Sequence, residues 1–274
     1  MTEIIKAIIL GIVEGVTEWL PISSTGHMIL VDEFLHLDVT PEFKELFLVV
    51  IQLGAILAVI FLFWKKIWPL GWERGKPKVK PDILRMWLKI IVACVPAAVV
   101  GLLLDDILNR LFYNYWTVAV MLILFGVLFL VVENKNRSRI PTITAADQID
   151  YKTALLIGVF QLIAAVFPGT SRSGATIVGA LLLGVSRVAA AEFTFYLAIP
   201  VMLGASAWKL LKFGLAFSGT EITVLAVGMG VAFLVSVLVI RFLMGYIKKH
   251  DFKVFGWYRI VLGAVVLGYF LLIG

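Results

Sequence analysis

Two short polar segments carry most of the side chains in this sequence that could perform chemistry. Residues 14–27 contain two glutamates, a run of hydroxyl residues and a histidine. Residues 168–174 read Pro-Gly-Thr-Ser-Arg-Ser-Gly, so two glycines flank three hydroxyls and one guanidinium. Carboxylates, hydroxyls, an imidazole and a guanidinium are the groups with which proteins bind and transfer phosphate. We therefore expect the function of the chain to reside in these two segments.

The two glutamates of the first segment suggest a metal site. Glu14 and Glu18 are four residues apart, so on a helix their carboxylates lie on one face. Two carboxylates this close repel each other in a low-dielectric site unless a cation or a shared proton lies between them. Mg²⁺ and Ca²⁺ bind carboxylate oxygens and bridge phosphates, so we interpret the pair as a divalent-cation site. The alternative, a solvated face of a short interfacial helix, fits poorly with the apolar neighbours Ile12, Val13, Val16, Trp19 and Leu20.

A helix break with adjacent hydroxyls follows the glutamates. Pro21 cannot continue the preceding helix, and Ser23, Ser24 or Thr25 can cap the next one. His27 would then lie on the first turn of the new helix, near these hydroxyls. A serine needs a base to act as a nucleophile, and this histidine could supply one. A helix cap beside a packed histidine explains the same residues equally well, so both interpretations stay open.

The second segment favours anion binding. Arg172 directly precedes an apolar helix, whose N-terminal N–H groups attract anions, and a guanidinium binds phosphate through two parallel hydrogen bonds. The segment is not a Walker A loop, because it lacks the Gly-Lys-Ser/Thr ending. The alternative is a helix cap whose arginine extends outward to water, which a position at membrane depth disfavours.

Both polar segments lie within stretches typical of a membrane protein. The 274 residues are 61% hydrophobic and 15% charged, with a mean hydropathy of +1.02, whereas soluble domains carry about 25% charged residues. We expect an all-α polytopic membrane protein with about six full transmembrane helices and two re-entrant helix–loop–helix hairpins. The full spans are expected at about 46–64, 83–104, 115–132, 190–208, 222–244 and 254–273, and the half-length pieces at 4–20, 27–35, 153–167 and 175–185.

The net charge of +6 does not indicate a nucleic-acid partner, because the basic residues gather in loops between spans. Such loops mark the cytoplasmic side of a membrane protein. They occur at about 65–85, 135–152 and 248–253, whereas 32–45 is acidic and is expected outside. With this threading, each polar segment enters and leaves the membrane on the same side. The two segments do so from opposite faces of the membrane.

The two halves of the chain resemble each other. A shift of 147 residues pairs Gly11 with Gly158, Glu14 with Gln161, Pro21 with Pro168 and Ser24 with Ser171. We predict one integral membrane domain, 1–274, built from an inverted-topology repeat with halves at about 1–133 and 150–274. A cytoplasmic loop, 134–149, would join the halves. Inverted repeats with broken helices place a binding site near the midplane of the membrane.

A polyprenyl diphosphate meets these requirements, with its tail among the spans and its head group between the carboxylates and the guanidinium. At both motifs, the sequence closely resembles the bacterial undecaprenyl-diphosphate phosphatases of the bacitracin-resistance type. The resemblance rests on Glu-Gly-Val-Thr-Glu-Trp-Leu-Pro-Ile-Ser-Ser-Thr-Gly-His at 14–27 and Pro-Gly-Thr-Ser-Arg-Ser-Gly-Ala-Thr at 168–176. It extends to the length, the span pattern and the repeat, and so covers the whole chain.

The resemblance implies hydrolysis of undecaprenyl diphosphate to undecaprenyl phosphate and inorganic phosphate, with a divalent cation, Mg²⁺ or Ca²⁺, as cofactor. It implies a multi-pass protein of the bacterial inner membrane with an active site open to the periplasmic side. The cellular roles implied are carrier recycling for peptidoglycan synthesis, cell-wall biogenesis and cell shape, and bacitracin resistance. A homodimer is compatible with the sequence.

Carried over position by position, the resemblance makes Ser24 the nucleophile, His27 its partner and Arg172 the phosphate clamp. Glu14 and Glu18 are the acidic pair, and Glu18 also counts among the catalytic residues. The residues expected at the metal are Glu14 and Glu18, and those expected at the substrate phosphates are Ser23, Thr25, Gly169, Thr170, Ser171, Arg172, Ser173 and Thr176. The sequence leaves open whether Ser24, His27 or water attacks the phosphorus.

Two other functions fit parts of the pattern. A transporter or flippase of polyprenyl phosphate lipids could use the same anion site and the same inverted repeat without any chemistry. Such a carrier needs no nucleophile, so Ser24 and His27 distinguish the two functions. A type-2 phosphatidic-acid phosphatase would need a second catalytic histidine after its Ser-Arg element, and only the distant His250 follows Arg172.

Overall fold

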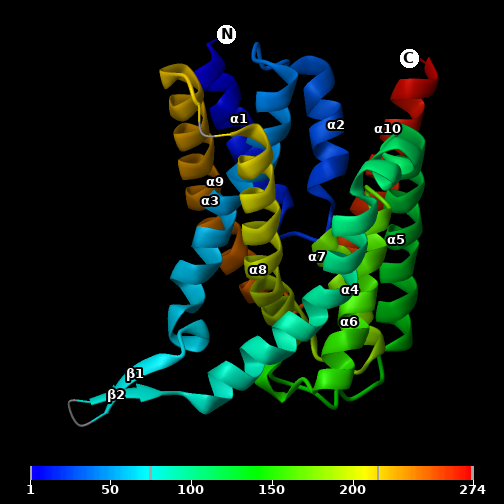
Figure 1. Ribbon diagram of the computed structural model, residues 1–274. Coiled ribbons are helices and arrows are strands. Elements are labelled where there is room, and N and C mark those ends of the chain that lie inside the picture. The colour runs from blue at the N-terminus through cyan, green and yellow to red at the C-terminus, as the bar shows by residue number, and fades with distance from the viewer. Residues whose placement is uncertain (1, 74–75, 215, 273–274) are drawn as a thin grey trace.

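The computed structural model describes residues 2–73, 76–214 and 216–272, and nearly all of its regular structure is helical (Figure 1). Six of its helices are long and apolar enough to cross a membrane. They are α3 (Pro41–Ile67), α4 (Pro81–Phe112), α5 (Tyr115–Lys135), α8 (Arg187–Phe213), α9 (Gly219–Tyr246) and α10 (Lys253–Leu272). These helices confirm the expected all-α, multi-pass membrane protein.

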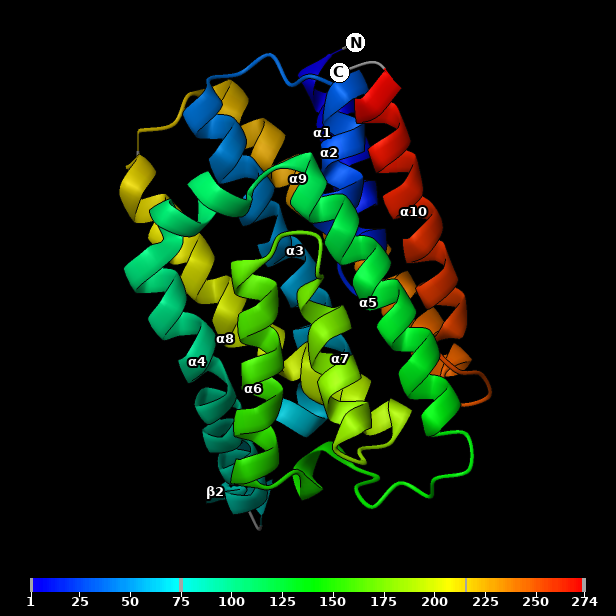
Figure 2. The ribbon, with the colours of Figure 1, turned by 90° about the vertical axis from the view of Figure 1, so that its right-hand side faces the viewer.

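Four shorter helices form the two hairpins that carry the polar segments. The first hairpin is α1 (Glu3–Thr17) with α2 (Ser24–Phe34), and the second is α6 (Tyr151–Val166) with α7 (Arg172–Leu182). Figures 1 and 2 show that the hairpins enter the helix bundle from opposite ends and that their turns meet near its middle. None of the four helices is long enough to span a bilayer alone. Their re-entry from the lipid stays a prediction.

The basic loops gather at one end of the bundle, which we call the basic end. It contains the connection between α3 and α4, residues 136–150 and residues 247–252 (Figure 1). The first connection is a two-stranded antiparallel hairpin of β1 (Leu70–Glu73) and β2 (Lys76–Val79), which the sequence analysis did not predict. A 3₁₀ helix, η1 (Ala146–Gln148), lies in the loop between the two halves.

Each short helix that opens a hairpin packs closely on a long helix of the other half. On α1, a Cβ at Gly11 would lie 2.7 Å from the carbonyl oxygen of Gly228 on α9. On α6, a Cβ at Gly158 would lie 2.3 Å from the carbonyl oxygen of Ala93 on α4. Small residues allow such backbone approach between membrane helices. Corresponding contacts of this kind support the predicted repeat, which stays a prediction.

The register of the repeat changes by one residue at the turns. Ser23 and Ser171 cap α2 and α7 with nearly the same backbone, at φ 74° and 69°, and each of these helices has 11 residues. The second hairpin thus has one more residue between its glycine and its capping serine. The shift of 147 expected from the sequence is wrong at this point, where it becomes 148. Arg172, not Ser171, is therefore the counterpart of Ser24.

Ion pairs link α3 and α8 at both of their ends. At the basic end, the Lys66 ammonium lies 2.7 Å from the carboxylate of Glu192. At the opposite end, the Lys209 ammonium lies 3.0 Å from the carboxylate of Glu45. These two helices have 27 residues each and pack against each other, and Phe195 of α8 contacts Trp19 in the turn of the first hairpin.

Candidate active site

Both motif turns are held in a backbone conformation that only glycine adopts at low cost. Among the described residues, the non-glycine residues with positive φ are Ser23 and Ser171. Each serine hydroxyl accepts a hydrogen bond from the N–H three residues later, at 3.3 Å for Gly26 and 3.1 Å for Gly174. These N-caps offset part of the strain and begin α2 and α7. Strain of this kind concentrates at functional sites.

The Glu18 carboxylate joins the two motifs. Its Oε2 accepts a hydrogen bond from Ser24 Oγ at 2.9 Å. Its Oε1 lies 3.1 Å from Nη2 of Arg172, which is 154 residues away in the sequence. Ser173 also donates to the Glu18 carbonyl oxygen, at 3.1 Å. The polar segments therefore form a single site, with a hydroxyl and a guanidinium on the two oxygens of one buried carboxylate.

Packing and hydrogen bonds fix the orientation of the Arg172 guanidinium. Its Nη1 donates to the Thr194 carbonyl oxygen of α8 at 3.0 Å, and the Thr194 hydroxyl lies 2.8 Å from Thr176 Oγ1. Thr176 also donates to the Arg172 carbonyl at 2.9 Å. Within the described structure, Arg172 Nε and Thr170 Oγ1 are buried without a hydrogen-bond partner. Each of these groups lacks the partner that buried polar atoms nearly always have.

His27 is oriented by two contacts, neither of them with Ser24. Its Nδ1 lies 2.7 Å from the Ser23 carbonyl oxygen, so this nitrogen carries a proton. Its Nε2 lies 2.7 Å from the Tyr258 hydroxyl of α10, which donates to it when the imidazole is neutral. The described contacts include no Ser24–His27 hydrogen bond, contrary to the pairing that the sequence suggested. His27 turns back onto the first turn of α2, and Glu18 is the partner of Ser24.

Most of the other expected phosphate ligands shape the turns. Ser23, Ser171, Ser173 and Thr176 all direct their hydroxyls to protein partners. Gly169, at φ 88°, lies against α5, where a Cβ would come within 2.5 Å of the Val118 carbonyl oxygen. Thr25 is half-buried on the first turn of α2. Arg172 and Thr170 are the expected phosphate ligands with an unpaired polar atom.

Glu14 fits one part of the expected cation site. It is 1% exposed, and its Oε1 has no hydrogen-bond partner within the described structure. A buried carboxylate oxygen without a donor is costly, so it needs a proton or a cation. The part of the chain that the structure describes contains no cluster of three or more acidic, histidine or cysteine ligands. Mg²⁺ commonly binds through one or two carboxylates, with waters and substrate phosphates as its other ligands, so the pair with Glu18 is a suitable donor set.

Sequence reasoning missed three residues of the site. Thr194 contributes mainly a backbone carbonyl, which no side-chain pattern reveals. Tyr258 reads as an ordinary aromatic residue of an apolar span. Arg259 lies fully buried beside both turns. An ionisable residue inside the apolar stretch 254–273 was the signal that could have identified it.

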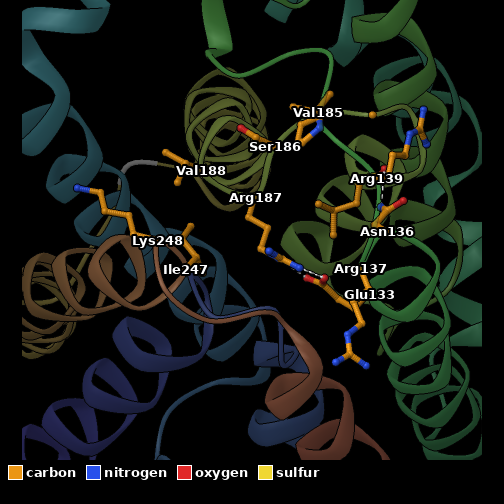
Figure 3. Close-up of a pocket in the computed structure, with 13 residues that line it drawn as sticks. Glu133, Asn136, Arg137, Arg139, Val185, Ser186, Arg187, Val188, Ile247 and Lys248 are labelled. Carbon is orange, nitrogen blue, oxygen red and sulfur yellow. Dashed lines mark hydrogen bonds and ion pairs between the residues drawn. The ribbon is translucent and has the colours of Figure 1, made fainter.

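A separate cavity of about 340 Å³ lies at the basic end and contains none of the motif residues (Figure 3). Figure 3 shows Arg187 pointing at Glu133, whose carboxylate oxygens lie 2.9 and 3.1 Å from its Nε. Arg139 donates to the Leu182 carbonyl at the C-terminal end of α7, at 3.1 Å. These arginines therefore have structural partners.

Comparison with known proteins identifies relatives along almost the whole chain. Residues 7–265 match the family described as bacitracin resistance protein BacA. An undecaprenyl-diphosphatase of Desulfitobacterium hafniense is 67% identical over 98% of this chain and 97% of its own length. Undecaprenyl-diphosphatase 1 of Clostridium acetobutylicum is 64% identical over 99% and 98%, and an undecaprenyl-diphosphatase of Enterococcus faecalis is 62% identical over 97% and 96%. Both motif segments fall inside the matched residues.

Proposed function

Because this chain belongs to the bacitracin resistance protein BacA family, we propose that it is an undecaprenyl-diphosphatase whose active site lies between the two motif turns. It hydrolyses undecaprenyl diphosphate to undecaprenyl phosphate and inorganic phosphate. The observation that carries this assignment is the Glu18 carboxylate, with Ser24 Oγ at 2.9 Å on one oxygen and Arg172 Nη2 at 3.1 Å on the other. A nucleophile, a base and a phosphate clamp thus lie within one hydrogen-bonded group.

Arg172 binds the terminal phosphate of the substrate. Its Nε and the Thr170 hydroxyl are unpaired donors, and the guanidinium keeps its orientation through the Thr194 carbonyl. A phosphate held there lies next to Ser24, because the same carboxylate contacts both side chains. The polyprenyl tail extends between the apolar helices into the lipid.

Ser24 is the nucleophile that the geometry favours. Its Oγ attacks the terminal phosphorus while Glu18 accepts the hydroxyl proton. The bond between this phosphorus and the bridging oxygen breaks, and undecaprenyl phosphate leaves with the electron pair. Water then attacks the phosphoserine, the bond between Ser24 Oγ and phosphorus breaks, and inorganic phosphate is released. The Glu18 carboxyl returns its proton to Ser24 Oγ, which restores the hydroxyl. His27, held between Ser23 and Tyr258, is the alternative nucleophile, and direct attack by water is the other alternative.

Glu14 and Glu18 would hold the divalent cation, Mg²⁺ or Ca²⁺, together with oxygens of the diphosphate. When bound, this ion neutralises the charge of the diphosphate and of the departing phosphate. The unpaired, buried Oε1 of Glu14 supports this role.

The protein is a multi-pass membrane protein, and we place it in the bacterial inner membrane with the site open to the periplasmic side. The basic loops support a cytoplasmic basic end. The first hairpin enters the bundle from the end opposite to the basic end (Figure 1). Hydrolysis on that side would recycle the lipid carrier for peptidoglycan synthesis. Two copies of the chain could associate as a homodimer without sharing this site.

Phosphate release from undecaprenyl diphosphate tests the proposal. Purified protein in lipid nanodiscs should release inorganic phosphate, and a chelator or Arg172→Ala should abolish release. Ser24→Ala should reduce the rate by at least about 10²-fold, whereas Ser138→Ala, on an exposed loop, should leave it unchanged. Binding of the lipid by wild-type protein without phosphate release would favour the polyprenyl-phosphate carrier and overturn the proposal. An active Ser24→Ala variant would exclude Ser24 as the nucleophile.

A further inference from the structure

The C-terminal helix α10 places a fully buried arginine against both motif turns. Arg259 is 0% exposed. Its Nη1 donates to the carbonyl oxygen of Pro21 in the first turn at 3.2 Å. Its Nη2 donates to the carbonyl oxygens of Gly169 and Thr170 in the second turn, at 3.0 and 2.7 Å. One guanidinium therefore bridges two segments that lie about 150 residues apart in the chain.

The surroundings of Arg259 are built to accept this charge. Within the described part of the chain it forms no ion pair, and longer contacts at 3.4 and 3.5 Å reach carbonyl oxygens of Met121 and Leu122 on α5. Its guanidinium also lies over the ring of Phe125. Burial of a charge without a counter-ion is costly unless its donors are paired, and these backbone carbonyls supply that pairing.

One glycine of the second motif leaves room for the guanidinium. A Cβ at Gly174 would lie 2.7 Å from Arg259 Nη1, so a side chain at this position would displace the guanidinium. The Gly174 N–H also donates to the hydroxyl of the capping Ser171. The motif and the arginine are therefore sterically matched.

The bridged carbonyls lie directly beside the strained serines. Thr170 immediately precedes Ser171, and Pro21 lies two residues before Ser23. The residues after these serines are Arg172 and Ser24, which are the proposed clamp and nucleophile. We propose that Arg259 is a positioning residue, which sets the separation of Ser24 and Arg172 and so controls the rate of the chemical step. This inference rests on the proposed phosphatase activity.

Arg259→Lys tests whether Arg259 positions the two turns or only supplies a buried positive charge. Lysine keeps the charge and most of the stem, but its single ammonium cannot donate to both turns in the planar geometry of a guanidinium. We expect Arg259→Lys to lower kcat for undecaprenyl diphosphate about 10- to 100-fold and to change KM less than about threefold. Arg241→Lys, on the exposed face of α9, is the matched control and should keep the wild-type kcat.

Chemical rescue provides the second measurement. In Arg259→Ala, guanidinium at millimolar concentration should raise kcat at least about tenfold, and the same concentration of KCl should not. A merely structural role would lower the melting temperature without a kcat rescue specific to guanidinium.

Wild-type kcat in Arg259→Lys would overturn the inference, as would a rise in KM alone. If Arg259→Ala does not fold, the lysine variant decides. Inactive wild-type protein would instead refute the proposed function, so the two failures are distinguishable.

Discussion

The clearest prediction concerns Glu18→Gln, which replaces the carboxylate between the two motifs by an amide of the same shape. In the wild type, one oxygen accepts from Ser24 at 2.9 Å and the other pairs with Arg172 at 3.1 Å. Glutamine offers one acceptor and one donor in place of two acceptors. It can satisfy Arg172 or Ser24 as an acceptor, but not both, and it cannot take the Ser24 proton.

Glu18→Gln loses the base for the Ser24 hydroxyl and the carboxylate partner of Arg172, and these two losses set the size of the effect. Removal of a general base costs about 10²- to 10⁴-fold in rate, which corresponds to about 3–5 kcal/mol of transition-state stabilisation. The fold should tolerate the change, because Arg172 keeps its bond to the Thr194 carbonyl and Trp19 keeps its edge-on contact with Phe195 at 5.3 Å. We expect a stability loss of about 1–3 kcal/mol, from the weakened buried hydrogen bonds.

The assay is phosphate release from undecaprenyl diphosphate in nanodiscs at saturating lipid and Mg²⁺, with the melting temperature of each variant measured in parallel. Glu45→Gln is the matched control, since this carboxylate is 72% exposed and pairs with Lys209 at the far end of the bundle. Exposed pairs contribute about 0–1 kcal/mol, so its kcat should be unchanged. A Glu18→Gln enzyme with more than a tenth of the wild-type kcat would refute Glu18 as the base.

Three further variants test individual contacts of the site. Arg172→Lys keeps the charge but loses the paired hydrogen bonds of a guanidinium to phosphate, so kcat/KM should fall about 10- to 100-fold. An unchanged kcat/KM would contradict the role of Arg172 in binding phosphate. Glu14→Gln should raise the Mg²⁺ concentration for half-maximal rate about tenfold or more, with the rate largely recovered at saturation. An identical Mg²⁺ titration would exclude this ligand. Tyr258→Phe removes one hydrogen bond to His27, worth about 0.5–1.5 kcal/mol. Turnover should therefore slow about 2- to 10-fold. A wild-type rate would mean that this bond has no role in turnover.

The spans and the broken helices were predictable from the sequence because both signals are local. Each of the six long helices covers an apolar stretch that was expected to cross the membrane. The two polar segments contain Pro21 and Pro168, which interrupt apolar runs, and helices do end and restart there. The basic loops also indicated which ends of the helices lie together. Placing the two segments in one site followed from this threading.

Details of the repeat and of the loops were not accessible to the same reasoning. The shift between the hairpins changes from 147 to 148 between Gly158 and Ser171, because the second hairpin has one more residue between its glycine and its capping serine. Sequence identities alone could not place that residue. The β1–β2 hairpin forms within a charged loop whose composition indicated orientation but no regular structure.

The sequence itself determined the set of reactive groups, the membrane-spanning helices and the two helix breaks. Composition, span length and the positions of prolines are local properties, so neighbouring residues are enough to indicate them. Only the tertiary structure decided which groups pair. Glu18, not His27, accepts from Ser24, because the positive φ of Ser23 turns the start of α2 and directs the imidazole to Tyr258. Arg259 joins the site from a helix without any motif. Hydrogen bonds depend on fractions of an ångström between distant segments, and only the packed helices set those distances.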